Sequence, residues 1–388
     1  MKKQLAIAFG ADEILKENNL KYSLEEAIKN IKKIEWQSAP YEKQSWGHPL
    51  HRIGPYVGRI KPAFCHALIK YLTKKGQTIL DPFCGIGTIP LEASLMQRNS
   101  IGFDLNPYAI HIATAKMTRN FDVEEKIEYV NSIKINTKKI SIKKIPEWVK
   151  NYYNEETLKE ILFLLNLFQE QKEDFLYGCL LAISQGHRPG HLSKPCGWTL
   201  PYKPRPDDPG EYREVKPRLI DKILRNYQEL EYETGTMNIK LQDSRAMPLA
   251  DKTIDAIISS PPYFNTLDYV NSHRLRLAIC GHYEEVVTKD LKQSLIQHKK
   301  TYLQEMELVI NEMRRVLKPS GLICFVVGDH FTENKKTINT SEKLVEIFEQ
   351  KKFKLIENIE DKIPINKSVQ KKTQNVKSER IIVLKKYG

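Results

Sequence analysis

The sequence contains little cysteine and no long apolar run. Its six cysteines lie far apart, and no two of them form a C-x-x-C pair. This spacing is unlike a disulfide scaffold and is typical of a protein in a reducing compartment. No stretch approaches the 18 apolar residues that a membrane span requires. The N-terminal MKKQLAIAFGADE turns acidic too early for a signal peptide, so we expect a cytoplasmic location and no membrane partner.

Acidic residues are fewer than basic ones. The chain has 61 Lys and Arg against 48 Asp and Glu, which gives a formal net charge of +13. This excess favours a polyanionic partner such as nucleic acid. Many of the lysines lie beside isoleucine and asparagine, and a compositional bias would produce the same pattern. The charge alone therefore leaves both interpretations open.

The sequence lacks a complete set of metal ligands at a recognised spacing. His187, His191 and Cys196 lie close together, but no fourth ligand follows at a suitable distance. A structural zinc site needs four ligands. We therefore expect no metal.

Helix and strand patterns alternate in two blocks of the chain. The first block begins at Pro62 with an amphipathic helix and continues through the strands QTILDPF and SIGFDL. The second begins at MNIKLQDS and ends with the strand ERIIVLKK. Alternation of this kind predicts an α/β fold, a doubly wound and mostly parallel sheet with helices on both faces.

A helical insertion separates the two blocks. We predict helices at about 155–170, 175–184 and 219–230, with a stretch rich in proline and glycine between the second and the third. The chain then divides into four segments: an N-terminal helix and basic loop (1–54), the first half of the sheet (55–130), the insertion (131–235), and the second half of the sheet with its closing strands (236–388).

The stretch ILDPFCGIGTIPLEA predicts a ligand-binding turn between a strand and a helix. Gly85 and Gly87 allow a tight turn, so that a ligand can approach the backbone and the helix N-terminus. The third glycine of a dinucleotide fingerprint is missing, and Asp81 and Phe83 precede the turn instead. A ligand with a cationic amino-acid portion would explain the aspartate, and S-adenosylmethionine is such a ligand.

Two further acids follow strands of the predicted sheet. Asp104 ends the next strand and is well placed to accept hydrogen bonds from two ribose hydroxyls. Asp243 follows the strand MNIKLQ and could meet the adenine amino group. Any one of these acids alone is better explained as a helix cap or turn residue. Three at successive strand ends favour a binding site, because ligands of doubly wound sheets bind there.

The stretch SSPPY predicts a rigid corner at the end of the strand TIDAIIS. Its two prolines fix the main chain so that the Ser260 hydroxyl and the Pro261 carbonyl face one point, beside the flat ring of Tyr263. Such a pocket suits a planar base with an exocyclic amino group. It requires no covalent intermediate, because positioning supplies most of the barrier reduction.

These motifs together resemble those of the amino-methylating DNA methyltransferases, which modify cytosine N4 or adenine N6. ILDPFCGIGT is similar to the family's cofactor loop, GFDLNP to its ribose-binding acid, SSPPY to its catalytic tetrapeptide, and RIKPAF to its remaining cofactor motif. The resemblance covers roughly residues 55–120 and 237–330. It implies a seven-stranded, Rossmann-like methyltransferase sheet and S-adenosylmethionine as the cofactor.

The resemblance also implies a set of site residues. The catalytic residues would be Ser260, Pro261, Pro262 and Tyr263. The cofactor would be held by Lys61, Pro62, Asp81, Phe83, Gly85, Gly87, Thr88, Asp104, Asn106 and Asp243. Phe64 belongs to the same N-terminal motif.

The insertion does not lie where the family's target-recognition domain is expected. Our hypothesis is that the insertion, with its 186–212 loop, contacts DNA, because basic and aromatic residues are interleaved there. The nucleic-acid-binding residues would be Arg188, Lys194, Lys203 and Arg205.

The sequence therefore predicts a methyltransferase that modifies an amino group of a flipped base in double-stranded DNA. Cytosine N4 is favoured by the serine that begins the tetrapeptide, and adenine N6 is the alternative. Methylation of guanine N2 in RNA ranks lower, because no RNA-binding module is recognisable. A catalytically silent nucleic-acid-binding subunit is disfavoured by the intact motifs. A restriction endonuclease as companion, the recognition sequence and the oligomeric state are left open.

Overall fold

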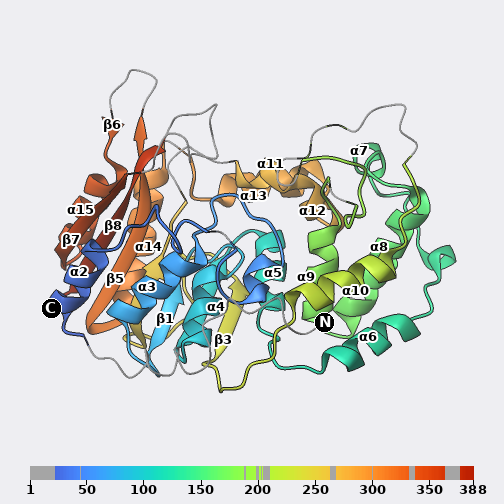
Figure 1. The fold of residues 1–388 in the computed structure, drawn as a ribbon. Helices are drawn as coiled ribbons and strands as arrows, with labels where there is room; N and C mark the ends of the chain where they lie inside the picture. Colours follow the sequence, from blue (N-terminus) through green and yellow to red (C-terminus); the bar gives the residue numbers. More distant parts are fainter. Residues whose placement is uncertain are drawn as a thin grey trace.

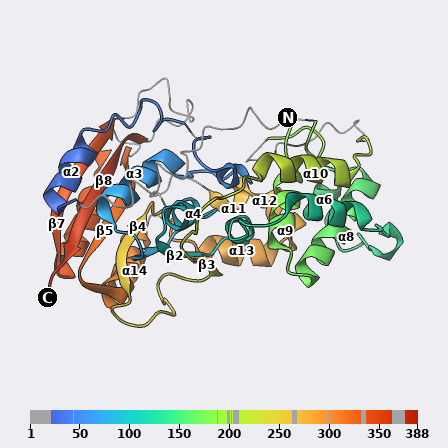
Figure 2. The same ribbon diagram turned by 60° about the horizontal axis from the view of Figure 1, so that its bottom comes forward.

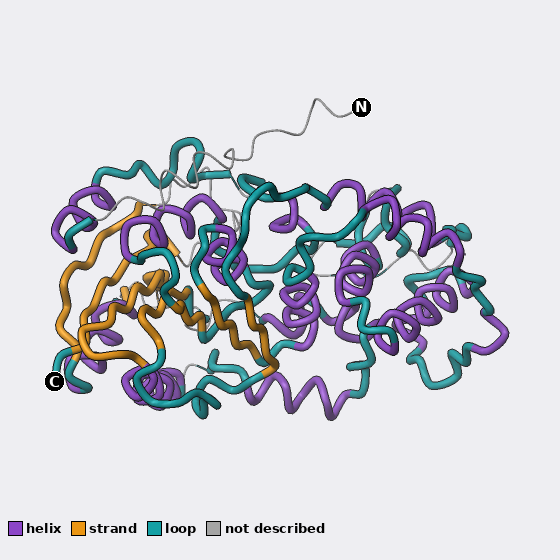
Figure 3. Tube along the Cα trace, turned by 90° about the horizontal axis from the view of Figure 1, so that it is seen from below, coloured by secondary structure: helices purple, strands orange, loops and turns teal. Residues whose placement is uncertain are grey.

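The computed structural model contains a mixed sheet and, beside it, a body of helices (Figure 1). The structure describes residues 22–43, 45–187, 189–197, 201, 203, 210–262, 268–298, 300–331, 337–362 and 376–388. Figure 3 shows the two parts side by side, with the strands in one half of the molecule and only helices and loops in the other.

Seven strands follow one another across the sheet in the order β3-β2-β1-β4-β5-β8-β7, and the short β6 pairs with β5. Strands β1 to β5 are parallel where they pair, whereas β8 is antiparallel to both β5 and β7. This confirms the predicted doubly wound, mostly parallel sheet with an antiparallel closing strand. The strands are β1 Thr78–Asp81, β2 Asn99–Asp104, β3 Met237–Leu241, β4 Ile254–Ser259, β5 Leu317–Phe331, β6 Thr337–Ile338, β7 Phe353–Lys362 and β8 Val376–Lys386.

Helices cover both faces of the sheet, as Figure 2 shows. Consecutive residues of a strand point to opposite faces, so Leu80 packs with α14 and α15 while Ile79 packs with α2, α3 and α4. Because both faces are buried, the central strand β4 is buried along nearly its whole length, whereas the edge strand β3 alternates between buried and exposed residues. The helices are α2 Leu24–Lys32, α3 Pro62–Leu72, α4 Thr88–Leu95, α14 Tyr302–Val316 and α15 Thr340–Gln350.

The insertion packs on the sheet through α5. This helix follows β2, and α9 lies against it so closely that a Cβ on Gly178 would come within 2.4 Å of the Ala115 Cβ. The predicted helix 155–170 is confirmed at its bounds, and the third predicted helix begins earlier, at Val215. The helices are α5 Pro107–Ala115, α6 Val123–Ser132, α7 Glu147–Lys150, α8 Glu155–Glu170, α9 Asp174–Ile183 and α10 Val215–Asn226.

Several short elements were not predicted. Helix α6 begins at the Asp122 cap, and the expected boundary at residues 130/131 falls inside it. The segment between β4 and α14 contains α11 Tyr269–Ser272, α12 Arg274–Ile279 and α13 Glu285–Ser294, and two 3₁₀ turns lie at η1 Pro49–Arg52 and η2 Thr137–Lys139. None of the described helices is long and apolar enough to cross a membrane.

Candidate active site

The glycine turn between β1 and α4 has the left-handed backbone that its sequence predicts. Gly85 has φ 48° and Gly87 has φ 70°, a region that side chains other than glycine rarely adopt. A Cβ on Gly87 would come within 2.9 Å of the Ala113 Cβ, and one on Gly85 within 3.1 Å of the Tyr56 ring. The turn therefore needs glycine both for its dihedral angles and for close packing.

Asp104, at the end of β2, is fixed by two backbone groups. Its Oδ2 accepts a hydrogen bond from the Gly85 N–H at 2.9 Å, and its Oδ1 accepts one from the Asn106 N–H at 2.8 Å. The carboxyl remains partly accessible, but burial raises its pKa to about 6 against the effect of these hydrogen bonds. Asn106 itself caps α5 through the Tyr108 and Ala109 N–H groups.

Asp81, at the end of β1, is almost completely buried, with 2% of its surface exposed. Its Oδ1 accepts hydrogen bonds from the Ser259 hydroxyl at 2.6 Å and from the Phe83 N–H at 3.1 Å. Burial nevertheless raises the pKa of Asp81 to about 7. Ser259 was not among the predicted site residues, although its position at the end of the adjacent strand β4 was a usable signal.

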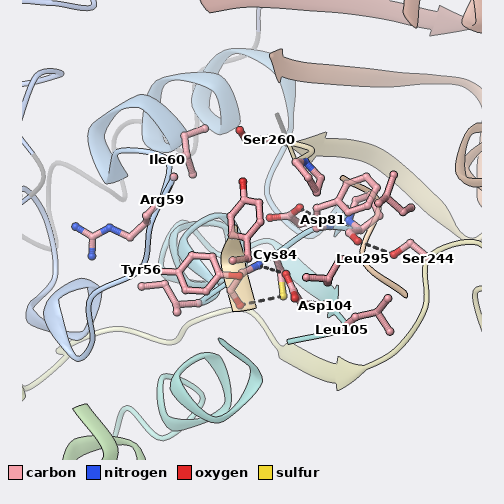
Figure 4. A pocket seen from close by; sticks show the side chains of 18 of the residues that line it. Tyr56, Arg59, Ile60, Asp81, Cys84, Asp104, Leu105, Ser244, Ser260 and Leu295 are labelled. Atoms are coloured by element: carbon pink, nitrogen blue, oxygen red, sulfur yellow. Dashed lines mark hydrogen bonds between the residues drawn. The ribbon is translucent and has the colours of Figure 1, made fainter. Parts of the chain in front are cut away.

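A cavity of about 810 Å³, a volume that includes its open mouth, lies at this edge of the sheet. Figure 4 shows Asp81, Asp104, Ser244 and Ser260 converging on it, while the Arg59 guanidinium points away. Eight of the fourteen predicted catalytic and cofactor-binding residues line this one cavity. They are Asp81, Phe83, Gly85, Thr88, Asp104, Asp243, Ser260 and Pro262.

The other predicted residues lie elsewhere. Gly87 and Asn106 shape the turn and the α5 cap behind the cavity, and Pro62 is buried in the first turn of α3. Lys61, just before α3, acts electrostatically on Asp361 of β7, whose pKa is raised by burial and partly lowered again by the lysine. None of these four is among the described residues that line the cavity, nor is Pro261. Tyr263 falls outside the described residues.

Asp243 carries a partner that the sequence did not predict. Its two carboxylate oxygens accept hydrogen bonds from the Arg245 Nε, each at 3.0 Å, and Oδ2 accepts another from Nη2 at 2.6 Å. Burial alone would raise the pKa of Asp243, but the arginine outweighs it and holds the pKa below its usual value. An adenine amino group would have to share this carboxylate with Arg245.

Aromatic residues from two distant segments form another wall of the cavity. Tyr56, from the loop before α3, and Tyr269, from α11, both line it. The Tyr56 ring stacks on His273 with ring centres 4.7 Å apart and an angle of 1° between the planes. His273 Nε2 accepts a hydrogen bond from the Val57 N–H at 3.3 Å. Neither Tyr56 nor Tyr269 was among the predicted site residues, because no sequence motif links two segments this far apart in the chain.

A buried lysine supports the glycine turn from behind. Lys116, at the end of α5, has no exposed surface, and its Nζ donates to the Ile86 carbonyl at 2.5 Å. Burial lowers the pKa of this ammonium group well below its ordinary value. The hydrogen bond fixes the one residue between the two site glycines.

The predicted nucleic-acid contacts are only partly described. Lys194 is half-buried, and its N–H donates to the Tyr152 carbonyl at 2.7 Å; Lys203 is exposed. Arg188 and Arg205 fall outside the described residues. Among the described side chains, no group of three or more His, Cys, Asp or Glu residues is arranged to hold a metal ion.

The fold and the site together define the class of protein. A glycine turn with acids at successive strand ends, beside a Ser-Pro-Pro corner, is a Rossmann-like methyltransferase arrangement. A family model described as DNA methylase, of the N6/N4 type, matches residues 9–115 and 254–387, and the chain therefore belongs to this DNA methylase family. The unmatched residues 116–253 include the insertion.

Curated relatives match over part of their length. The type II methyltransferase M.BsoBI of Geobacillus stearothermophilus is 28% identical over 282 residues, which are 61% of this chain and 54% of that protein. The type II methyltransferase M.MjaII of Methanocaldococcus jannaschii is 29% identical over 142 residues, 36% of this chain and 25% of that protein. The chain thus spans about half the length of the first relative and a quarter of the second.

A solved structure matches this chain weakly. It is a SAM-dependent methyltransferase from Methanosarcina mazei, 12% identical, and the match covers 82% of this chain and 97% of that one at a TM-score of 0.35.

Proposed function

We propose that the protein transfers a methyl group from S-adenosylmethionine to the exocyclic amino group of a flipped base in double-stranded DNA, with cytosine N4 as the preferred target. One observation carries the proposal: Ser260 and Pro262 line the same cavity as Asp81 and Asp104. A methyl donor and its acceptor must meet within such a space. Membership of the DNA methylase family supports the same reaction class.

The residues of the cavity fit the cofactor. Asp81 offers a buried carboxylate to its ammonium group, and the fixed oxygens of Asp104 offer acceptors to the ribose hydroxyls. Asp243, shared with Arg245, is the proposed acceptor for the adenine amino group. When bound, S-adenosylmethionine supplies an electrophilic methyl group on a sulfonium. The raised pKa of Asp81 fits a carboxyl whose natural partner is a ligand cation.

The Ser-Pro-Pro-Tyr segment would activate the base. An aromatic amino nitrogen is a poor nucleophile, because its lone pair is delocalised into the ring. In the proposal the Ser260 Oγ and the Pro261 carbonyl accept its two protons in hydrogen bonds, which draws the nitrogen towards tetrahedral geometry and frees its lone pair. Tyr263 would stack on the base plane. Prolines on both sides of this carbonyl would limit its movement.

The target amino group is out of reach inside a stacked duplex, so the proposal includes base flipping. Extrusion costs a few kcal/mol, which contacts to the rest of the DNA must supply. We assign those contacts to the insertion, with Arg188, Lys194, Lys203 and Arg205 as its basic residues. Replacement of Arg188 and Arg205 together should weaken DNA binding and flatten its salt dependence, as measured by anisotropy titrations.

The identity of the product tests the proposal. The purified protein is incubated with isotopically labelled S-adenosylmethionine and either duplex DNA or transfer RNA, and the nucleosides are separated by mass spectrometry. Labelled N4-methylcytosine in DNA is expected. N6-methyladenine would keep the reaction class and change the base, whereas methylated guanosine confined to RNA would overturn the proposal.

Variants of the adjacent Ser259 and Ser260 distinguish a catalytic role from a structural one. Ser260→Ala should lower the methylation rate by roughly 10²-fold and leave cofactor affinity nearly unchanged, because only the proposed amino-group acceptor is lost. Ser259→Ala is the matched control. It removes the hydroxyl that binds Asp81 and should alter cofactor affinity instead. Equal activity of Ser260→Ala and the native protein would contradict the assigned role.

The type II designation of the two relatives extends the proposal to a companion restriction endonuclease. DNA from cells that express the protein should then resist a type II enzyme of the same recognition sequence.

A further inference from the structure

An irregular loop, residues 185–197, follows α9, and its described residues, 185–187 and 189–197, are held by hydrogen bonds within the loop. The Gly186 N–H donates to the Ser193 Oγ at 3.1 Å, and the Gln185 side chain donates to the Gly197 carbonyl at 2.6 Å. Leu192 and Ser193 are buried. Because backbone groups of an irregular segment normally depend on water, a loop with this many internal bonds has a defined shape.

Arg276 holds the start of this loop from α12. Its guanidinium has no exposed surface, and Nη2 donates to the Gln185 carbonyl at 2.7 Å and to the Ala182 carbonyl at 3.4 Å. The last carbonyls of a helix have no partner within the helix and carry partial negative charge. Arg276 therefore caps α9 and fixes the point from which the loop departs.

Arg213, which follows the loop in the chain, holds the same loop by its carbonyls. Its Nη1 donates to the His191 carbonyl at 2.8 Å and to the Ser193 carbonyl at 2.9 Å. The backbone of Arg213 is itself attached to α8, because its N–H and carbonyl both bond to the Thr157 hydroxyl. The guanidinium thus reaches the loop from a fixed base.

The two arginines turn four carbonyls of the α9 end and the loop inward, towards positive charge. The outward surface then keeps basic and polar side chains, among them the exposed His187 and the half-exposed Lys194. A surface on which these four carbonyls are already occupied, and which presents the Lys194 ammonium group, suits a polyanion.

The loop is also attached to the segment that follows the Ser-Pro-Pro corner. Helix α12, which carries Arg276, comes directly after α11, whose Tyr269 lines the cavity. Arg274 of the same helix donates to the Pro201 carbonyl at 3.0 Å and lies over the Trp148 ring of α7. The loop is therefore fixed to the same segment that forms part of the active site.

We propose that Arg213 and Arg276 are positioning residues that shape the 185–197 loop into the element that reads the DNA sequence. The inference rests on the proposed DNA methylation and names the segment that selects its target. Neither guanidinium contacts DNA in this proposal; both act by holding loop carbonyls.

If Arg213 acts by positioning the loop, its replacement should change DNA binding differently from the loss of a direct phosphate contact. Arg213→Ala should lower affinity for the recognised sequence by about tenfold or more, since a loop that is no longer held loses its contacts with the bases. Affinity for unrelated DNA should stay the same, and so should the dependence of binding on salt. Lys194→Ala, which removes a proposed phosphate contact, should instead reduce the salt slope by about one. Both are measured by anisotropy titrations with the recognised and a scrambled duplex.

Two further variants control for folding and charge. Arg276→Lys keeps the charge but replaces the planar guanidinium that donates to the Ala182 and Gln185 carbonyls. It should show the same loss of sequence preference as Arg213→Ala. Lys75→Ala, in the exposed turn before β1 at the opposite edge of the sheet, should behave as the native protein. Calorimetric titration with S-adenosylhomocysteine identifies any variant that has lost its fold. Arg213 is only partly buried, so its variant carries the test if Arg276→Lys does not fold.

Sequencing of DNA from cells that express each variant gives the methylated sequences directly. Methylation spread to related sequences in Arg213→Ala is the expected result. An unchanged site preference in a variant that binds the cofactor normally would overturn the inference while leaving the proposed function intact. Absence of DNA methylation by the native protein would instead remove the proposed function.

Discussion

Asp81 is an acid in a place where the protein itself disfavours its charge. It lies at the edge of the sheet, where two donors among the described residues bond to it, and burial raises its pKa to about 7. Burial also raises the pKa of the neighbouring Asp104, to about 6. A ligand cation next to Asp81 would favour the ionised form that burial disfavours. Binding of the cofactor should therefore be linked to release of a proton.

We expect the affinity for S-adenosylmethionine to rise as the pH increases from about 5.5 towards 7 and beyond. Below the pKa of Asp81, a proton must leave before the carboxylate can pair with the ligand's ammonium group, so each pH unit costs up to about tenfold in affinity. Above that pKa the dependence flattens. Calorimetric titrations in two buffers of different ionisation enthalpy measure both the affinity and the released proton.

Asp81→Asn should bind the cofactor weakly and lose the pH dependence that Asp81 contributes near pH 7, so that only the weaker contribution of Asp104, whose pKa is about 6, is left. Asp290→Asn, which changes an exposed carboxylate on α13, should keep the native profile. An affinity for the native protein that does not change between about pH 5.5 and 7 would show that Asp81 does not pair with the ligand cation.

The acids at the strand ends could be predicted because chain position alone brings them together. Asp81 and Asp104 end adjacent parallel strands, and the Thr78–Asn99 register places them at one edge. Ser259 and Arg245 were not predicted as partners of these acids. The strand position of Ser259 was a usable signal that it lies in the site, but the contacts of both residues depend on their side-chain rotamers, which a sequence pattern does not specify.

At the scale of elements, the glycine turn depends on close packing as well as on backbone freedom. Gly87 lies at φ 70° with Ala113 of α5 directly behind it, whereas Gly76 lies at φ 80° with no atom within 4 Å of a Cβ. The two positions share a left-handed backbone, and they differ in the room that is available for a Cβ. They form a matched pair for separating the two effects.

Gly87→Ala should lower the free energy of unfolding by roughly 2–4 kcal/mol, of which about 1–2 come from the left-handed backbone and the rest from the contact with Ala113. Gly76→Ala should lower the free energy of unfolding only by the contribution from the left-handed backbone. Urea unfolding measures both, and calorimetry should show weakened cofactor binding for Gly87→Ala alone. Equal destabilisation of the two variants would contradict the packing role.

The elements that the sequence predicted well have strong apolar periodicity. Helix α8 has a continuous apolar face and an Asn154 cap, which define both of its ends. The short helices α11 and α12 lie in a segment with no clear period, and tertiary contacts such as the burial of Arg276 and His273 hold them. Local pattern does not reveal an element of four to six residues whose stability comes from distant partners.

At the scale of the whole molecule, the insertion and the sheet share one hydrophobic core. A single buried cluster joins Tyr108 and Ile112 of α5 to Leu176 and Leu180 of α9, and it continues to Leu275 of α12. The sequence divided the chain into segments at changes of pattern. It gave no indication that α5 would bury one side against the insertion, because the helix is apolar on nearly all sides.

A shared core predicts that the sheet and the insertion unfold together, although a chain of 388 residues is long enough for separate transitions. Separate unfolding would expose the α5 surface against which α9 packs, at about 25 cal/mol for each Å² of apolar area. Hydrogen exchange with mass spectrometry at increasing urea should therefore show peptides from α9 and from α4 losing protection at the same concentration. A cofactor analogue should shift both midpoints equally, since it binds only the folded state. Peptides from α9 that lose protection well before those from α4, with the analogue protecting only the latter, would show that the insertion is an independent unit.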